Sequence, residues 1–453
     1  MAVERFFASP VPYRSVDSDT MLERFRVVTA SVSFEGDVPS FFKWLSDGGI
    51  PLLPEERETG GFPVVGAGGA LTYINPLILS SVCDFIILGD GMDVLPHTVS
   101  CLREYSSHGD RRRLWRELAE DPRVLVPPLH LVGGCVSAQR QVGRTLQLDG
   151  PYPMCSVWTS PRGAFGDTLL VELQRGCMRN CRYCTLPGCF GRIRFRRFGF
   201  LKNTMDAALS ATGAGQVGLV TPEAGDYIDM GPLLDYLDEK QEAVSFASLR
   251  VDHLTERMID TLARGGRHSI TIAPEAGRDE LRFACGKKFT NDLVLEKLAL
   301  ARDHGIDQVK MYFMIGLPGE TEEDIAAIPD LCSRIIAETG QNLILSVNPF
   351  VPKPGTPWAR EEFCGLASIR GKYEQLGAGV RSFKKKAPQL RLTSAKEAQA
   401  EFDAAWYSHE ESRALALQIE NGKKGKICRS DRDKTLRYLL QLGYLGQQEK
   451  APQ

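Results

Sequence analysis

The sequence predicts an α/β protein with two successive parallel-sheet domains followed by a mainly helical region. Short apolar strand signals alternate with helix-period segments in the first third of the chain, and a more regular alternation of six units begins at Thr168. Strand signals stop after Pro357. Because parallel strands need crossover connections, such alternation favours parallel sheets. We therefore expect domains over residues 1–160, 161–360 and 361–453.

Composition indicates an ordinary globular protein. The 453 residues are 43% hydrophobic and 25% charged, and 55 basic residues nearly balance 57 acidic ones. This balance indicates neither a nucleic-acid partner nor a membrane surface. The first residues do not resemble a signal peptide, and no window has the length and apolarity of a spanning helix. We expect a cytoplasmic protein.

The first domain is expected to hold three strands, at Arg26–Ser33, Phe62–Val65 and Phe85–Leu88, with a helix over Pro39–Ser46. A stretch rich in Pro and Gly then runs from Pro122 to Gly166. Such a stretch is typical of a linker, so the domain boundary is expected inside it.

The second domain is expected to be an open, partial (β/α)6 barrel whose loops after the strands build the active site. Helix-period segments separate the strands, for example Leu254–Arg264, Asn291–His304 and Glu322–Glu338. The six expected strands are Thr168–Leu173, Gln216–Val220, Val244–Leu249, Ser269–Ala273, Gln308–Ile315 and Leu343–Val347.

A cysteine-rich loop follows the first of these strands. Cys177, Cys181 and Cys184 lie within eight residues, and thiolates select zinc, copper(I) or iron–sulfur clusters. Three thiolates on a four-iron cubane leave one iron open. The alternative adds Cys189 as a fourth ligand, which gives a closed electron-transfer cluster or a structural zinc site. The spacing differs from that of zinc ribbons and favours the open cluster.

The C-x3-C-x2-C spacing, with the aromatic Tyr183 before the last cysteine, resembles the signature of the radical S-adenosylmethionine (SAM) superfamily. The resemblance implies that Cys177, Cys181 and Cys184 hold a [4Fe-4S] cluster whose open iron is chelated by SAM. It also implies that one low-potential electron cleaves SAM to methionine and a 5'-deoxyadenosyl radical. A flavodoxin or ferredoxin is the expected electron donor.

The same resemblance implies a set of SAM-binding residues near the ends of the strands. Glu223 lies where the family has a Gly-Gly-Glu element for the SAM amino group, and Gly316 lies in a segment similar to the family's glycine motif. Simpler roles are a helix cap for Ser248, salt bridges for Arg250 and Glu275, and a tight turn at Gly316. The expected SAM-binding residues are Tyr183, Glu223, Ser248, Arg250, Glu275, Ile315, Gly316 and Phe350.

The first domain resembles the Rossmann-like cobalamin-binding domains that precede some radical SAM domains. A dinucleotide role is not expected, because the G-x-G-x-x-G pattern fails at Leu71. A D-x-H-x-x-G motif is absent, and Pro128 stands where an aspartate would precede His130. Either cobalamin binds without a histidine ligand, or the cofactor has been lost. The expected pocket residues are Gly68, Gly69, Asn75, Gly89 and Gly91.

The expected reaction is cobalamin-type methyl transfer to an unactivated carbon. One alternative is a cobalamin-independent radical rearrangement or oxidation. Methylthio transfer is a weaker alternative, because the usual N-terminal trio of cluster cysteines is missing: Cys83, Cys101 and Cys135 are spread apart along the chain, although they could converge in space. A non-catalytic iron–sulfur or zinc protein, or a SAM sensor, would keep the thiols but show no turnover. The substrate cannot be inferred from the fold.

Overall fold

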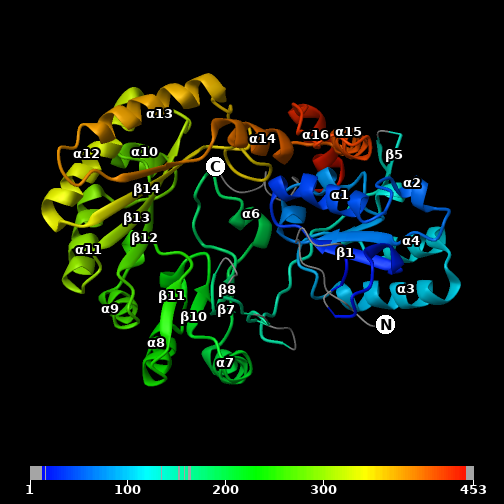
Figure 1. Cartoon of the computed structure of the whole chain (residues 1–453), viewed down its shortest axis with the longest axis horizontal. Coiled ribbons are helices and arrows are strands. Elements are labelled where there is room, and N and C mark those ends of the chain that lie inside the picture. Colours follow the sequence, from blue (N-terminus) through cyan, green and yellow to red (C-terminus); the bar gives the residue numbers. More distant parts are fainter. Residues whose placement is uncertain are drawn as a thin grey trace. The chain divides into compact units, whose positions relative to one another are not determined.

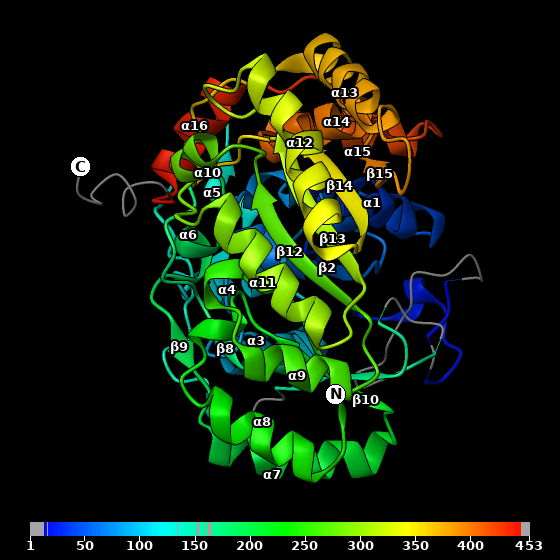
Figure 2. The ribbon, with the colours of Figure 1, turned by 90° about the vertical axis from the view of Figure 1, so that its left-hand side faces the viewer.

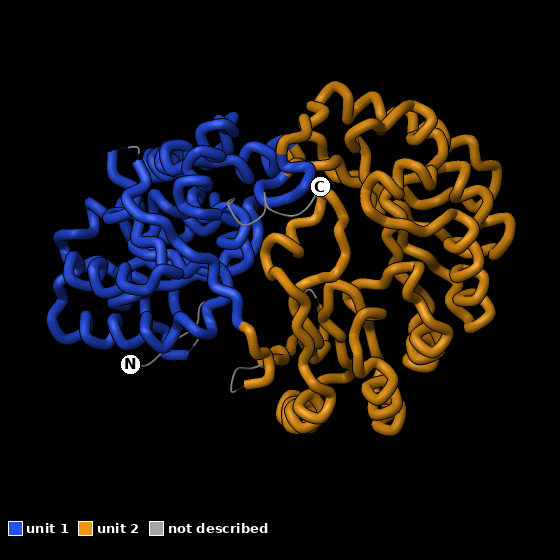
Figure 3. The backbone as a smooth tube through the Cα atoms, turned by 180° about the vertical axis from the view of Figure 1, so that it is seen from behind, with its two compact units in different colours: residues 1–145, 353–359, 399–453 blue, residues 146–352, 360–398 orange. Residues whose placement is uncertain are grey.

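The computed structural model describes residues 13–444 except residues 16, 134, 151–153, 158 and 162–164. The chain divides into two compact units (Figure 3). Unit 1 comprises residues 1–145, 353–359 and 399–453, and unit 2 comprises residues 146–352 and 360–398.

Unit 1 is built on a four-stranded sheet in the order β1-β2-β3-β4, with β1 to β3 parallel and β4 antiparallel to β3. Because neighbouring strand residues point to opposite faces, the sheet has two apolar faces. One face packs against α1 (Val38–Asp47), and the other packs against α3 (Leu95–His108) and α4 (Arg111–Ala119). The strands are β1 (Val27–Ser31), β2 (Val64–Gly68), β3 (Phe85–Ile87) and β4 (Val124–Leu125).

Two helices from the C-terminal end of the chain complete unit 1. They are α15 (His409–Glu420) and α16 (Arg432–Gln441), whose apolar residues Leu415, Ile419 and Leu439 join the core that contains β1. Residues 361–453 therefore do not form a region of their own, in contrast to the expected division. Periodicity along the chain shows that these helices have apolar faces, but it does not show which sheet covers them.

Unit 2 contains two parallel sheets. The first has the order β11-β10-β7 and the second the order β12-β13-β14-β15. Helices lie on the outer side of both sheets (Figure 1). The strands are β7 (Thr168–Glu172), β10 (Gln216–Val220), β11 (Ala243–Phe246), β12 (Ser269–Glu275), β13 (Gln308–Ile315), β14 (Asn342–Pro349) and β15 (Gln389–Leu392).

The α/β fold class and the six expected strands are confirmed, and the structure adds a seventh strand to the two parallel sheets of unit 2. Strand β15 pairs in parallel with β14 at the edge of the second sheet. The expectation that strands end after Pro357 is therefore wrong. Residues Gln389–Leu392 are only four residues long and are mostly exposed, so they lack the apolar run by which a buried strand is recognised.

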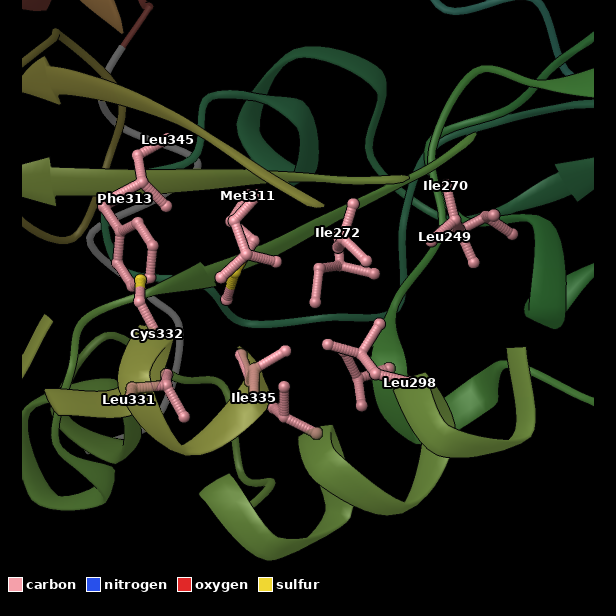
Figure 4. Close-up of a cluster of buried hydrophobic side chains, with 14 of the residues drawn as sticks. Leu249, Ile270, Ile272, Leu298, Met311, Phe313, Leu331, Cys332, Ile335 and Leu345 are labelled. Carbon is pink, nitrogen blue, oxygen red and sulfur yellow. The ribbon is translucent and has the colours of Figure 1, made fainter. Parts of the chain in front are cut away.

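The main core of unit 2 lies between the second sheet and its outer helices, which lie in front of that sheet in Figure 2. Met311 and Phe313 on β13 point toward Leu331 and Ile335 (Figure 4). Alternate residues of β13 are half-buried and face away from these helices. The helices are α9 (Glu256–Arg264), α11 (Asn291–Asp303), α12 (Glu322–Thr339) and α13 (Gly365–Arg381).

Shorter elements connect these layers. In unit 1 they are α2 (Pro54–Arg57), α5 (Pro127–His130), β5 (Leu131–Val132) and β6 (Cys135–Val136). In unit 2 they are β8 (Gln174–Arg175), α6 (Leu186–Phe190), β9 (Arg194–Phe195) and α10 (Asp279–Ala284). The longer helices α7 (Phe198–Thr212) and α8 (Met230–Glu239) pack against the first sheet of unit 2. Helix α14 (Ala395–Ala405) contributes residues to both units. No helix among the described residues is long and apolar enough to cross a membrane.

Candidate active site

The three predicted cluster cysteines lie on one loop between β8 and α6 in unit 2. Cys181 is buried, and Cys177 and Cys184 are half-buried. The backbone N–H of Arg179 donates to Cys177 Sγ at 3.4 Å, and the N–H of Cys184 donates to the carbonyl of Cys181 at 3.1 Å. The loop is thus tightly turned, with its thiols close enough to influence one another.

The thiols are held in an environment that opposes their ionisation. Burial and, to a smaller extent, the neighbouring thiolates of Cys181 and Cys177 raise the pKa of Cys184 to about 11. Burial and Cys181 also raise the pKa of Cys177. Because only a thiolate binds metal, a bound cation must displace these protons.

This soft donor set fits an iron–sulfur cluster, in which each thiolate binds a different iron. Among the described residues, no three His, Cys, Asp or Glu side chains are grouped as ligands of one metal ion.

The segment after α10 packs against the cysteine loop. The backbone N–H of Arg182 donates to the carbonyl of Cys285 at 3.0 Å. Gly286 has φ +91°, and a Cβ there would lie 2.5 Å from the carbonyl oxygen of Asn180. A larger residue at position 286 would therefore displace the loop that carries the thiols.

A buried triad links the same loop to the end of β12. The Tyr183 hydroxyl donates to Glu275 Oε1 at 2.7 Å, and Lys287 Nζ donates to the same oxygen at 2.6 Å. Burial and the Glu275 carboxylate raise the pKa of Tyr183. Glu275 has φ +65°, an unfavourable backbone conformation for a residue other than glycine. The triad thus ties Glu275, whose backbone is strained, to the aromatic residue of the cysteine motif.

A second charged group reaches the cluster loop from the end of β11. Arg250 pairs with Asp252 at 2.8 Å, and its Nη1 lies 3.9 Å from Cys181 Sγ, within hydrogen-bonding distance for sulfur. Arg179, on the loop itself, pairs with Asp226 and donates to His253 Nε2 at 2.8 Å. Arg250 therefore brings a positive charge beside the Cys181 sulfur.

Glu223 follows β10 and has one carboxylate oxygen without a partner. Its Oε1 accepts the N–H of Gly225 at 3.0 Å, whereas Oε2 is buried and has no hydrogen-bond partner. Burial raises the pKa of Glu223 to about 7, although hydrogen bonding by the backbone N–H groups of Gly225 and Arg250 and the charge of Arg250 oppose the rise. A buried carboxylate oxygen without a donor is costly, and a cationic ligand would satisfy it.

The other predicted SAM residues lie at the ends of β11, β13 and β14. Ser248 is half-buried. Ile315 packs its side chain into the core, so only its backbone can face a ligand; its carbonyl accepts the N–H of Phe350 at 2.8 Å. Gly316 has φ +75°, and a Cβ there would lie 2.4 Å from Cys364 Sγ. Glycine is thus required at position 316 by packing as well as by backbone conformation.

Sequence reasoning missed four residues of this region: Arg179, Asp226, His253 and Lys287. Each contacts its partner across a long stretch of chain or through a loop, so no periodic pattern marks it. The one available signal was the position of Arg179 inside the cysteine motif. The fourth thiol considered, Cys189, is buried on α6.

Comparison with known families decides the identity. The model of the radical SAM superfamily matches residues 171–332, which include the cysteine loop, and the model of the N-terminal part of radical SAM proteins matches residues 3–127. The chain belongs to the radical SAM superfamily of enzymes. The predicted family is thereby confirmed.

Curated relatives of this radical SAM enzyme include proteins with and without an assigned activity. An uncharacterized protein of Methanocaldococcus jannaschii is 28% identical over 78% of this chain and 72% of its own length. The tRNA-2-methylthio-N(6)-dimethylallyladenosine synthase of Herminiimonas arsenicoxydans is 26% identical over 56% of this chain. The chain matches 59% of the length of that synthase.

Two solved radical SAM structures share the fold. The methyltransferase TsrM from Kitasatospora setae, with cobalamin and a [4Fe-4S] cluster bound, has a TM-score of 0.57 at 14% identity and matches over 88% of both chains. The cobalamin-dependent enzyme OxsB, with aqua-cobalamin and SAM bound, has a TM-score of 0.52 at 15% identity and covers 93% of this chain and 58% of OxsB. At these identities the likeness concerns the fold.

The residues of the predicted cobalamin pocket lie in unit 1, and three of them serve internal packing. The Asn75 amide donates to the carbonyls of Ala405 and Tyr407, and its Oδ1 accepts the N–H of Leu77. A Cβ at Gly69 would meet the Val32 carbonyl at 2.6 Å, and one at Gly89 would meet the Gly143 carbonyl at 2.4 Å.

A Cβ at Gly68 or Gly91 would make only ordinary van der Waals contacts, at 3.7 Å or more, with Ile87 or Leu95. His130 is buried, its Nδ1 accepts the N–H of Val126, and burial lowers its pKa to about 4. Of the five predicted pocket residues, Asn75 is thus engaged in internal hydrogen bonds, and no step of the reaction is assigned to the set.

Proposed function

We propose that the chain cleaves SAM reductively at a [4Fe-4S] cluster held by Cys177, Cys181 and Cys184, and that Glu223 binds the SAM amino group. The observation that carries this proposal is the unsatisfied, buried Oε2 of Glu223. Arg250 connects the two parts of the site, since it reaches Cys181 Sγ and its charge acts on Glu223. A cationic group that donates a hydrogen bond to Glu223 would thus lie beside the cluster loop.

A reduced cluster at these thiols supplies the electron that breaks a carbon–sulfur bond of SAM, which yields methionine and a 5'-deoxyadenosyl radical. The chain's own residues bind and orient. Glu223 accepts hydrogen bonds from the SAM ammonium, and its raised pKa falls when that cation binds. Tyr183, held by Glu275, fixes the loop that carries the thiols. The positive φ of Gly316 lets backbone approach the ligand.

Three further assignments belong to this proposal. Ser248, Ile315 and Phe350 contribute polar atoms or backbone at the strand ends to the SAM site. The electron comes from a flavodoxin or ferredoxin, because the reaction consumes one low-potential electron for each SAM cleaved. The enzyme acts in the cytoplasm, where such carriers are available.

Cobalamin-dependent methyl transfer is a second candidate function. The observation that favours it is the fold likeness to TsrM over 88% of both chains.

Methylthio transfer is not favoured, although relatives carry that activity. Cys83 and Cys101 lie in the apolar cores on opposite faces of the unit 1 sheet. They cannot both bind the same second cluster.

The test uses anaerobically reconstituted protein incubated with SAM and dithionite, with and without cobalamin. Mass spectrometry measures 5'-deoxyadenosine and S-adenosylhomocysteine. We expect deoxyadenosine above the level of a Cys181→Ala control, and the Cys189→Ala protein should match the wild type. S-adenosylhomocysteine that depends on cobalamin would support methyl transfer. Equal deoxyadenosine in the wild type and the Cys181→Ala control would refute the proposal.

A further inference from the structure

The second sheet of unit 2 has one face that its outer helices do not cover. Along β13 every second residue is buried against the helices, and Lys310, Tyr312 and Met314 on the opposite face are half-buried. The parallel register aligns Tyr312 with Ser346, and Ser346 with Arg391. Residues aligned in this way point to the same side of the sheet. We call this surface the inner face of the second sheet.

The inner face carries positive charge and no acid. Its positions on the four strands are Ser269, Thr271, Ala273, Gln308, Lys310, Tyr312, Met314, Asn342, Ile344, Ser346, Asn348, Gln389 and Arg391. None of these is Asp or Glu. The acid that ends β12, Glu275, is already paired with Lys287 at 2.6 Å. The charges of Lys310 and Arg391 are therefore not balanced on their own face.

Lys310 is the more enclosed of the two cations. Its Nζ donates to the Tyr312 hydroxyl at 2.6 Å and lies 4.6 Å from the centre of that ring. Within the described part of the chain, no carboxylate oxygen lies within the 4.0 Å ion-pair limit of Lys310. Other cations of unit 2 differ, since Arg250 pairs with Asp252, and Lys372 pairs with Glu320 at 2.6 Å.

A half-buried ammonium without a carboxylate partner favours an anionic ligand. Its two remaining hydrogens are free to donate, while the Tyr312 hydroxyl accepts from Lys310 and can itself donate to the same ligand. Arg391 lies two strands away in the same row, about 10 Å from Tyr312 between Cα atoms at the usual strand spacing. Its long side chain can reach across that distance toward a shared ligand.

We propose that the inner face binds the substrate of this enzyme through an anionic group, a carboxylate or a phosphate, and that Lys310, Tyr312 and Arg391 are its ligands. Met314 and Ile344 on the same face provide apolar contact beside the anion. This proposal rests on the proposed function, because it assumes that the 5'-deoxyadenosyl radical reacts with a substrate bound at the inner face of the second sheet.

The test measures binding of two probes to the full-length reconstituted protein. Inorganic phosphate is followed by phosphorus NMR line width, and acetate labelled with carbon-13 by carbon NMR line width. Lys310→Met should weaken the better-bound probe about tenfold or more, because a charged hydrogen bond is lost. Arg391→Met should weaken it less, and Lys310→Arg should retain most of the binding.

The matched control is Lys384→Met, which removes an exposed lysine of the same unit and should change nothing. Tighter phosphate binding identifies a phosphorylated substrate, and tighter acetate binding a carboxylate. Equal affinity in the wild type and in Lys310→Met protein with matched iron content and circular dichroism would overturn the proposal. So would loss of the probe on addition of SAM, because Lys310 would then belong to the SAM site.

Failure of the two proposals can be told apart in the wild-type enzyme. Deoxyadenosine formation without substrate tests SAM cleavage and does not involve the probes. If deoxyadenosine forms and neither probe binds, the anion site alone is refuted. If the probes bind through Lys310 but no deoxyadenosine forms, the proposed cleavage of SAM fails and the anion site stands.

Discussion

Replacing Glu223 with glutamine should stabilise the protein at alkaline pH while abolishing SAM binding. Burial raises the pKa of this carboxyl from 4.5 to about 7, so the folded state holds a proton that the unfolded state releases. Below about pH 4.5 both states are protonated and the group has no effect. As pH rises from about 4.5 to 7 the folded state loses stability, and above about pH 8 the full cost applies.

The magnitude follows from the difference between the two pKa values. A difference of about 2.5 pH units at about 1.4 kcal/mol per unit gives a cost of about 3.5 kcal/mol above pH 8. Glutamine is neutral at every pH and avoids this cost. The Glu223→Gln protein should therefore be more stable than the wild type by about 2–3 kcal/mol at pH 8, and nearly equal to it at pH 4.5.

The assay is urea unfolding of full-length protein with matched iron content, followed by circular dichroism at both pH values. Exposed Glu239, at the end of α8, provides the control substitution Glu239→Gln, which changes the charge equally and should leave the pH profile unaltered. SAM binding is measured by equilibrium dialysis. A Glu223→Gln protein that is less stable at pH 8, or that binds SAM as the wild type does, would refute the reasoning.

Three further predictions concern the surroundings of the cluster. Lys287→Met should lower the free energy of unfolding by about 3 kcal/mol in urea titrations, because it leaves the Glu275 carboxylate buried and unpaired. Equal stability of the two proteins would exclude the ion pair. Gly316→Ala should cost about 1–2 kcal/mol from the positive φ alone, measured in the same way, and no loss would contradict the backbone conformation. Arg250→Met removes the hydrogen-bond donor to Cys181 Sγ. The cluster's midpoint potential should fall on the order of tens of millivolts in EPR-monitored titrations. An unchanged potential would argue against that contact.

Most of the strands could be predicted from the sequence because apolar runs and helix periods alternate regularly. Gln216–Val220 and Gln308–Ile315 match β10 and β13 residue for residue. Strand β15 was missed because an exposed edge strand lacks an apolar run. The assignment of α15 and α16 to unit 1 was also missed, since it depends on contacts such as that of Ser412 with the carbonyl of Ile78 across 334 residues.

The site could be predicted only where residues share a short motif or a strand end. The cysteine loop and Glu223 were found in this way. Lys287 was not, because its link to Glu275 requires the turn after α10 that brings residue 287 back to the end of β12. Asn75 illustrates the opposite error. It was placed in a cofactor pocket, whereas its amide is used to fasten the segment before α15 to unit 1.

The central claim is that three cysteines hold a cluster with one iron left open for SAM. The most direct measurement is low-temperature EPR of the dithionite-reduced protein with and without SAM, on the wild type and on Cys189→Ala. The account predicts a [4Fe-4S] signal in both proteins that changes when SAM is added. A signal that SAM does not change, together with loss of the cluster in Cys189→Ala, would show a closed four-cysteine cluster and contradict the account.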